Sequence, residues 1–379
     1  MKKVLHIANV DRMIHNIRLE LLIALREKGY EVHICATATI PEFIERFEKE
    51  NFIFHNIDVF RGLNPINVLK CSYQIRKLIK SEKFDIIHSH TPTGGMVGRM
   101  GAYLAGYNKI FHTTAGLYFH ENMPKWKYNF FAGIERYLTK KTQVLFSPNY
   151  EDINTCNALN IKPKHSIVYC GPTGVKLEKY DLSDKDILRS NTRKELNLEP
   201  DAIIIGIVAR LVFEKGYKEF IDVISRLNAQ GHKLHAVSVG SGPQESEIKA
   251  YAKDMKVDNI TFLGYSLTVP DQVKSYDIFL FPSYREGLPI VTLESMASKV
   301  PIVAFKIRGC RESIVDGVTG YLVDFLDVDA MYEKTLLLLE NETLRNEMGK
   351  KGRERVEDMF TKKHHVDRQL PFYDEFINA

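Results

Sequence analysis

The feature that most constrains the fold is a repeated alternation of short apolar strands with helix-forming segments. Residues 203–209 (Ile-Ile-Ile-Gly-Ile-Val-Ala) form an unbroken apolar run, which is typical of a strand buried on both faces of a parallel sheet. Shorter runs at 235–239 and 276–281 repeat this pattern, with helical stretches between them. Strands that alternate with helices predict an α/β fold built on a doubly wound parallel sheet.

The first half of the chain shows the same alternation. Its length of 379 residues suits two domains that each bury a core. Because glycine and proline cluster at 171–174 and a charged stretch follows, we expect a first domain over 1–178 and a second over 179–359. Expected strands of the first domain are 4–8, 31–36, 84–88, 109–113, 143–147 and 166–169, and expected helices are 14–28, 65–82 and a Gly/Ala-rich segment at 94–105.

Composition indicates an ordinary soluble protein, with 44% hydrophobic and 26% charged residues. No apolar run approaches the roughly 18 residues needed to span a bilayer. The basic and then apolar start breaks at Asp11-Arg12, so it indicates a first strand and not a signal peptide. Five scattered cysteines fit reduced thiols in a cytoplasm, and their spacing does not match a zinc site.

Charge is distributed unevenly along the chain. Residues 1–180 hold 25 Lys and Arg against 16 Asp and Glu, and the remainder holds 27 against 32. A basic first half favours an anionic membrane surface or a lipid diphosphate as its partner. Nucleic acid is a poor partner, because the sequence lacks the dense basic runs of known modules. An ordinary solvated surface is the alternative.

Polar motifs follow each strand of the second half. Arg210 and Lys215 lie on one strand-to-helix loop, where two cations suit a diphosphate. Gly240-Ser241-Gly242 follows the next strand, and glycines there would let the backbone approach a ligand. Glu286 lies on the loop after the third strand and Glu294 in the helix that follows, so the two carboxylates could clasp sugar hydroxyls. Solvated surface groups are the alternative for each motif.

In this order, the motifs resemble those of the family-4 retaining glycosyltransferases of the GT-B fold. Residues 262–264, 309–312 and 316–323 continue the match. The resemblance implies two Rossmann-like domains facing a central cleft, with the tail 360–379 crossing back onto the first domain. It also implies a nucleotide diphosphate sugar as donor, expected to be a UDP-linked HexNAc or hexose. The resemblance assigns catalytic roles to Glu286, Arg210 and Lys215, and donor binding to Gly240, Gly242, Gly287, Leu288, Pro289, Ile290, Val291 and Glu294.

We expect no cofactor and no metal requirement, because the two cations can do the work usually given to Mg²⁺ and the sequence lacks an Asp-x-Asp motif. The loop after the first strand also lacks Gly-x-Gly-x-x-Gly, which argues against a dinucleotide dehydrogenase. That loop contains Asp11-Arg12, and it resembles the Asp-Arg loop of relatives that extend lipid-linked glycans. Asp11 and His15 are therefore candidate acceptor-side residues. The resemblance therefore implies a polyprenyl-diphosphate-linked glycan acceptor in bacterial surface polysaccharide or glycoprotein synthesis.

The acceptor is expected in the first domain. His90 ends a strand and resembles the last histidine of an Asp-x-x-His-x-His segment, so it is a candidate cleft residue. Many relatives carry a histidine where this chain has Ala115. The usual contact is therefore absent, or it comes from His112 or His120. Retaining transfer does not clearly need a protein base, because the leaving phosphate can accept the proton.

The segment 123–141 combines aromatic residues at helical spacing with flanking Lys and Arg. Such a helix can lie in a membrane interface or pack its aromatic face on the core. Peripheral contact with the cytoplasmic face of the plasma membrane is our expected location. The open alternatives are a small soluble acceptor, a nucleotide-sugar epimerase, a phosphorylase and a sugar-nucleotide binder without catalysis.

Overall fold

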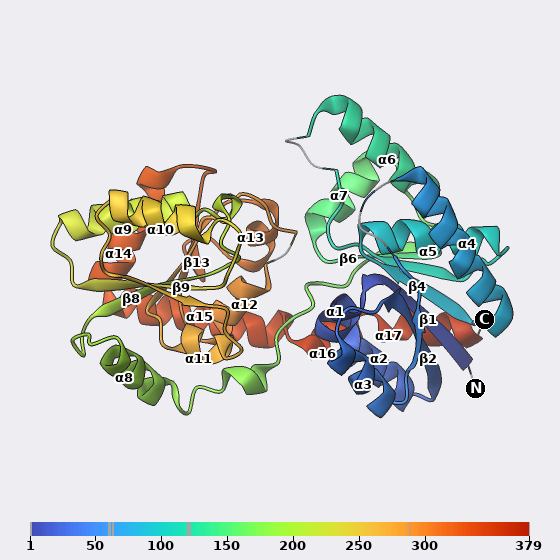
Figure 1. The fold of residues 1–379 in the computed structure, drawn as a ribbon, viewed down its shortest axis with the longest axis horizontal. Coiled ribbons are helices and arrows are strands. Elements are labelled where there is room, and N and C mark those ends of the chain that lie inside the picture. Colours follow the sequence, from blue (N-terminus) through green and yellow to red (C-terminus); the bar gives the residue numbers. More distant parts are fainter. Residues whose placement is uncertain (1, 60–61, 63, 120–122, 288, 379) are drawn as a thin grey trace. The chain divides into compact units, whose positions relative to one another are not determined.

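The computed structural model describes residues 2–59, 62, 64–119, 123–287 and 289–378. The chain divides into two compact units (Figure 1). Unit 1 contains Met1–Thr173 together with Lys362–Ala379, and unit 2 contains Gly174–Thr361.

Unit 1 is a seven-stranded parallel sheet in the order β3-β2-β1-β4-β5-β6-β7. The strands are β1 Lys2–Val10, β2 Tyr30–Thr37, β3 Ile53–Asn56, β4 Ile86–His90, β5 Ile110–Thr113, β6 Val144–Ser147 and β7 Ser166–Tyr169. The helices are α1 Asp11–Met13, a π-helical segment Ile14–Arg18, α2 Leu19–Glu27, α3 Pro41–Lys49, α4 Pro65–Glu82, α5 Pro92–Leu104, α6 Lys125–Thr139, α7 Tyr150–Ala158, α16 Lys362–Asp367 and α17 Leu370–Asn378.

Unit 2 is a six-stranded parallel sheet in the order β10-β9-β8-β11-β12-β13. The strands are β8 Ile203–Val208, β9 Leu234–Val239, β10 Ile260–Gly264, β11 Ile278–Phe281, β12 Ile302–Phe305 and β13 Gly320–Val323. The helices are α8 Lys185–Glu195, α9 Tyr217–Ala229, α10 Glu245–Asp254, α11 Val269–Lys274, α12 Ile290–Ala297, α13 Arg308–Ser313, α14 Val328–Glu340 and α15 Glu342–Met359, with 3₁₀ turns at Leu177–Tyr180 and Phe213–Lys215.

The prediction of two doubly wound parallel sheets is confirmed. In each unit the strand order reverses beside the first strand, between β1 and β4 and between β8 and β11. Ligands of open α/β sheets bind at such a reversal, outside the carboxyl ends of the strands. The topology therefore identifies one candidate site in each unit.

Two predicted boundaries in unit 1 are wrong. The helix expected at 14–28 starts at Asp11 and passes through the π-helical segment before α2. The strand expected at 84–88 lies two residues later, because Lys83 ends α4 in a left-handed conformation. Asp85 then accepts a hydrogen bond from the Lys3 amide at 2.7 Å, so the chain enters the sheet only at Ile86.

The Gly/Ala-rich helix α5 packs closely on its neighbours. A Cβ on Gly94 would lie 3.0 Å from the Ala8 backbone, and one on Gly98 would lie 3.2 Å from the Ile7 side chain. A Cβ on Gly101 would lie 2.9 Å from the Ser72 carbonyl of α4. Helix α4 packs beside α5 (Figure 1), so this glycine face fixes α5 between the sheet and α4.

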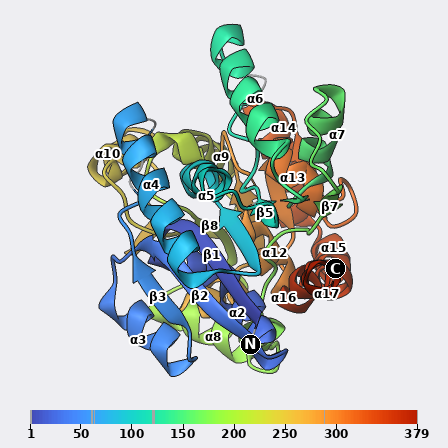
Figure 2. The ribbon, with the colours of Figure 1, turned by 90° about the vertical axis from the view of Figure 1, so that its right-hand side faces the viewer.

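Helix α6 behaves differently from α5. One end of it extends beyond the other helices of unit 1 (Figure 2), and Trp126 in its first turn is 69% exposed. Its other face is anchored by Ala132 and Leu138, which are buried. No helix in the described part of the chain is both long and apolar enough to cross a membrane.

Candidate functional site

In unit 2, the loops after β8, β9 and β11 interlock at the carboxyl ends of the strands. The Leu211 amide donates to the Ser241 carbonyl at 3.1 Å, which joins the first loop to the second. The Tyr284 amide donates to the Glu214 carbonyl at 2.9 Å, which joins the third loop to the first. Backbone bonds between loops leave little freedom to each, so the side chains they carry are held in a fixed arrangement.

The glycines of these loops are required by this packing. A Cβ on Gly240 would lie 1.9 Å from the Ala209 carbonyl oxygen, and one on Gly242 would lie 2.3 Å from the Leu211 carbonyl oxygen. Gly216 has a φ of 78°, and a Cβ there would lie 2.0 Å from the Pro282 carbonyl oxygen. The sequence suggested that Gly240 and Gly242 let the backbone approach a ligand. In the structure, these glycines let two loops approach each other. Their role in donor binding stays a prediction.

The three loops bring Lys215 and Glu286 into contact. Lys215 Nζ lies 2.7 Å from Glu286 Oε1, and the two side chains are 19% and 21% exposed. The buried Ser283 hydroxyl donates to the same carboxylate oxygen at 3.1 Å. Lys215 ends a 3₁₀ turn and Gly216 then turns left-handed into α9, and the lysine contacts the loop after β11. We call Lys215, Ser283 and Glu286 the unit 2 cradle.

Arg210 lies on the same loop as Lys215, at the surface. Its side chain is 62% exposed, and its Nη2 lies 3.4 Å from Glu214 Oε1. An exposed pair of this kind contributes little to stability. Its partner is therefore easily exchanged for another anion.

The helix that follows the third loop, α12, starts without a side-chain cap among the described residues. Gly287, Pro289, Ile290 and Val291 form its entry and first turn, and Leu288 lies outside the described residues. Uncapped amides at a helix N-terminus are donors for an anion.

Glu294 lies one turn into α12 and is partly buried. Burial raises the pKa of its carboxyl group, and a hydrogen bond with Tyr180 opposes this effect. Tyr180 belongs to the 3₁₀ turn Leu177–Tyr180, so the carboxylate is held by a segment distant in sequence. Tyr180 and Ser283 were not predicted from the sequence, because neither lies in a motif.

Unit 1 contains a cavity of about 160 Å³ beside the carboxyl ends of β4 and β5. Helices α5 and α6 and the loop after β5 form most of its wall. It is lined by Gly62, Thr91, Pro92, Thr93, Met96, Arg99, His112, Thr114, Ala115, Gly116, Leu117, Tyr118, Phe119, Phe131, Ile134, Glu135 and Leu138. His112 and Ala115 are thus brought to one cavity, whereas His120 lies outside the described residues.

His112 is a neutral, oriented ring at the polar end of this cavity. Burial, and then the charge of Arg99, lowers the pKa of His112 to about 3. Its Nδ1 lies 3.0 Å from the Ser89 carbonyl oxygen. Since a carbonyl only accepts, Nδ1 carries the proton and Nε2 keeps its lone pair. A Cβ on Gly95 would lie 2.2 Å from the ring, so the glycine makes room for it.

Two further features of the cavity wall were not predicted. The Thr114 hydroxyl is buried and has no hydrogen-bond partner among the described residues. Arg99 donates to both carboxylate oxygens of Glu135, at 2.7 and 2.9 Å. Burial alone would raise the pKa of Glu135, but Arg99 lowers it to about 2. The Arg99–Glu135 ion pair forms part of the wall, and its two charges neutralise each other. The unpaired Thr114 hydroxyl is available to a ligand.

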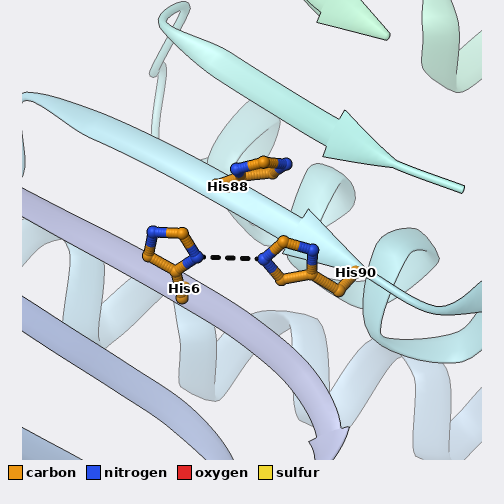
Figure 3. A group of neighbouring side chains, drawn as sticks. All are labelled: His6, His88 and His90. Atoms are coloured by element: carbon orange, nitrogen blue, oxygen red, sulfur yellow. Dashed lines mark hydrogen bonds between the residues drawn. The ribbon is translucent and has the colours of Figure 1, made fainter. Parts of the chain in front are cut away.

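His90, the predicted cleft residue, is buried and does not line the cavity, so its contact with a ligand stays a prediction. Side chains alternate along a strand, so Ser89 of β4 contacts His112 on the cavity side whereas His88 and His90 point to the opposite face. There, His90 Nε2 lies 3.0 Å from Nδ1 of His6 on β1 (Figure 3). All three histidines are buried.

The nitrogens of His6, His88 and His90 lie within 4.8 Å of one another, a spacing that could hold a metal ion. Their hydrogen bonds favour a structural network instead. His88 contacts Tyr373 through Nδ1 and Thr113 through Nε2, and His6 Nε2 lies 3.3 Å from the Tyr373 hydroxyl. These contacts can all be made by neutral rings. The buried guanidinium of Arg18 nearby adds a positive field that opposes a cation.

Asp11 and His15 also have structural partners. The Asp11 carboxylate accepts hydrogen bonds from the Thr39 and Ile40 amides at 2.6 and 2.8 Å. Burial opposes ionisation of Asp11, but these bonds lower its pKa. The His15 ring stacks on Phe43 with 4.0 Å between centroids. Both residues therefore fix the start of α3, and the structure does not bring them into the cavity lining given above.

The buried histidines predict that stability falls in mild acid. Burial lowers the pKa of His6, His112 and His365 to about 3, against about 6.5 in an unfolded chain. Their contribution is therefore complete above pH 6.5 and is lost as pH falls from 6.5 towards 3. Each should remove on the order of 1 kcal/mol per pH unit in that window. Urea unfolding at pH 7.5, 6.0 and 5.0 measures this loss, and a constant midpoint would contradict the neutral assignment.

Comparison with known proteins identifies the family to which the chain belongs. The model of "Glycosyl transferase 4-like" proteins matches residues 3–149, and that of "Glycosyl transferases group 1" matches residues 189–355. The capsular polysaccharide biosynthesis glycosyltransferase CapM of Staphylococcus aureus is 27% identical, over 99% of this chain and 98% of the relative.

Two further similarities extend the comparison. The UDP-Gal:alpha-D-GlcNAc-diphosphoundecaprenol alpha-1,3-galactosyltransferase of Escherichia coli is 27% identical, over 84% of this chain and 82% of the relative. The structure of Anabaena HepE in complex with UDP superposes with a TM-score of 0.80 at 15% identity, over 99% of this chain and all of HepE. This chain therefore belongs to the two-domain glycosyltransferases of the GT-B fold, with a 4-like domain followed by a group 1 domain.

Proposed function

We propose that this glycosyltransferase moves a sugar from a UDP-linked HexNAc or hexose to a glycan carried on a polyprenyl diphosphate. The transfer would retain the anomeric configuration and serve bacterial surface glycan synthesis. The observation that carries the donor half is the Lys215–Glu286 contact beside the uncapped start of α12. The acceptor half is supported by the relative whose name specifies a diphosphoundecaprenol acceptor.

When the donor binds, Lys215 of the cradle would exchange its partner, from the Glu286 carboxylate to the diphosphate. Lys215 and Glu286 neutralise each other in the free protein. An arriving diphosphate, with more negative charge than one carboxylate, draws Lys215 and the exposed Arg210 to itself. Glu286 then loses its cation and can accept hydrogen bonds from the hydroxyls of the donor sugar. Glu294 would hold the ribose hydroxyls in the same way.

Electrostatic stabilisation of the leaving group is the proposed source of catalysis. As the bond between the sugar's anomeric carbon and the phosphate oxygen breaks, negative charge grows on the diphosphate. Lys215, Arg210 and the first-turn amides of α12 stabilise that charge more in the transition state than in the ground state. The acceptor oxygen bonds to the anomeric carbon from the same face, and its proton passes to the leaving phosphate. No metal ion takes part in this proposal.

The polar end of the unit 1 cavity is the proposed acceptor contact. His112 presents an unprotonated Nε2 and Thr114 an unpaired hydroxyl, so together they offer an acceptor and a donor. This pair matches the hydroxyl groups of a glycan. His112 would compensate for Ala115, which has no polar side-chain atom.

Helix α6 is the proposed contact with an anionic membrane surface. Trp126, Phe130 and Tyr137 are 69%, 58% and 52% exposed, and lysines at 125, 127, 140 and 141 flank them. Exposed aromatics with flanking lysines are typical of helices that lie in a headgroup interface. The buried Ala132 and Leu138 support packing of one face of this segment on the core, and the exposed aromatics of the other face support the proposed membrane contact.

Charge removal tests the cradle. Lys215→Ala and Arg210→Ala should each lower kcat/KM by about a hundredfold or more, the usual effect of losing one group that stabilises transition-state charge. Lys218→Ala is the matched control, because Lys218 Nζ lies over the rings of Phe213 and Tyr251. UDP release from the preferred UDP-sugar measures the rates. Equal losses in all three variants would contradict the diphosphate assignment.

Vesicle binding tests the membrane face. The double substitution Trp126→Ala with Phe130→Ala should lower cosedimentation with phosphatidylglycerol vesicles at least tenfold, because it removes the apolar anchors. Tyr265→Ala removes an aromatic residue that is 75% exposed in unit 2 and is the control. Cosedimentation of the double variant at the wild-type level would rule out α6 as the contact.

A further inference from the structure

A second hollow of about 490 Å³ adjoins the cavity of unit 1 between α5 and α6. It is lined by Met96, Met100, Asn129, Phe130, Gly133, Ile134, Tyr137 and Leu138. Met96, Ile134 and Leu138 also line the cavity that contains His112. The two hollows are therefore neighbours across shared apolar side chains, and we call the second one the α5–α6 groove.

We propose that the α5–α6 groove binds the isoprenoid chain of the acceptor's lipid carrier. This inference rests on the proposed function, which supplies a lipid-linked acceptor, and it adds where the lipid part is bound. The chain would lie between α5 and α6, with its diphosphate and glycan towards Thr91 and His112.

The chemistry of the groove favours a hydrocarbon over a peptide. Asn129 and the Tyr137 hydroxyl are the polar side-chain groups of its lining. A bound peptide would lose water from its own N–H and C=O groups and would find few partners, which is costly. An isoprenoid has no such groups. Two methionines in the wall are adaptable contacts that suit a flexible, branched chain.

Charge at the groove's outer edge supports an amphiphile that enters from a membrane. Lys141 Nζ lies 4.3 Å from the ring centroid of Tyr103 and 5.7 Å from that of Tyr137. A cation held among exposed aromatics suits the boundary between lipid headgroups and acyl chains. A second copy of this chain is a poor occupant of a symmetric interface centred on this edge, because Lys141 would lie near its own copy and the two would repel.

Gly133 makes the groove testable without disturbing the core. A Cβ at this position of α6 meets no described atom within 4 Å, so a larger side chain can enter the groove. Gly133→Phe should therefore fill the space meant for the lipid. Asn157→Phe adds the same ring at an exposed position of α7 and is the matched control.

The probe is farnesyl diphosphate, and the readout is fluorescence of Trp126, the one tryptophan of the chain. Farnesyl diphosphate should change the fluorescence saturably in the wild type and in Asn157→Phe. Gly133→Phe should raise its Kd at least tenfold, and Met100→Gln, which makes the wall polar, should raise it in the same direction. Inorganic diphosphate, which has the head without the chain, should produce no such change.

Three results would overturn the groove assignment: no saturable binding to the wild type, equal affinity in Gly133→Phe, or an equal response to inorganic diphosphate. UDP binding, measured on the same samples by thermal shift, separates this outcome from failure of the proposed function. A wild type that binds UDP but not farnesyl diphosphate would refute the groove alone. A wild type that binds neither would refute both.

Discussion

The contact between Lys215 and Glu286 is the interaction on which the proposed chemistry of unit 2 depends. It joins the loop after β8 to the loop after β11, and Ser283 fixes its carboxylate. Exact placement of two flexible side chains requires rigid loops. Glycines at 216, 240 and 242 provide this rigidity, because each allows one loop backbone to touch another. The site is thus organised before a donor arrives, which lowers the cost of binding and of stabilising charge.

In unit 1, side chains alternate along β4 between a buried structural network on one face of the sheet and the candidate ligand cavity on the other. His88 contacts Tyr373 of α17, and His90 contacts His6, which also lies beside the Tyr373 hydroxyl, so the three histidines form a buried polar network. Ser89 faces the opposite way and orients His112 in the cavity. The network and the orienting contact come from adjacent residues of one strand. A change at His88 or His90 is therefore expected to affect the attachment of α17, and a change at Ser89 is expected to affect the cavity.

The parallel sheets could be predicted because their strands are continuous apolar runs separated by helical periodicity. Strand β3 and helix α3 were not predicted, since β3 has only four residues and Ile53 within it is 42% exposed. The sequence placed Lys215 and Glu286 in one donor site with different roles, but it did not predict that they contact each other. The histidine cluster joins residues 6, 88 and 90 through the register of β1 against β4. Such pairings depend on tertiary structure, which local sequence does not specify.

The most direct test of the account is whether UDP competes with Glu286 for Lys215. Titration calorimetry with UDP, in the presence of EDTA, should show about 1.4- to fivefold tighter binding to Glu286→Gln than to the wild type, because a partly exposed ion pair contributes about 0.2–1 kcal/mol that UDP no longer has to displace. The same change made in a Lys215→Ala background should leave the affinity unaltered. If Glu286→Gln weakens UDP binding, or alters it equally in both backgrounds, the proposed charge exchange is wrong.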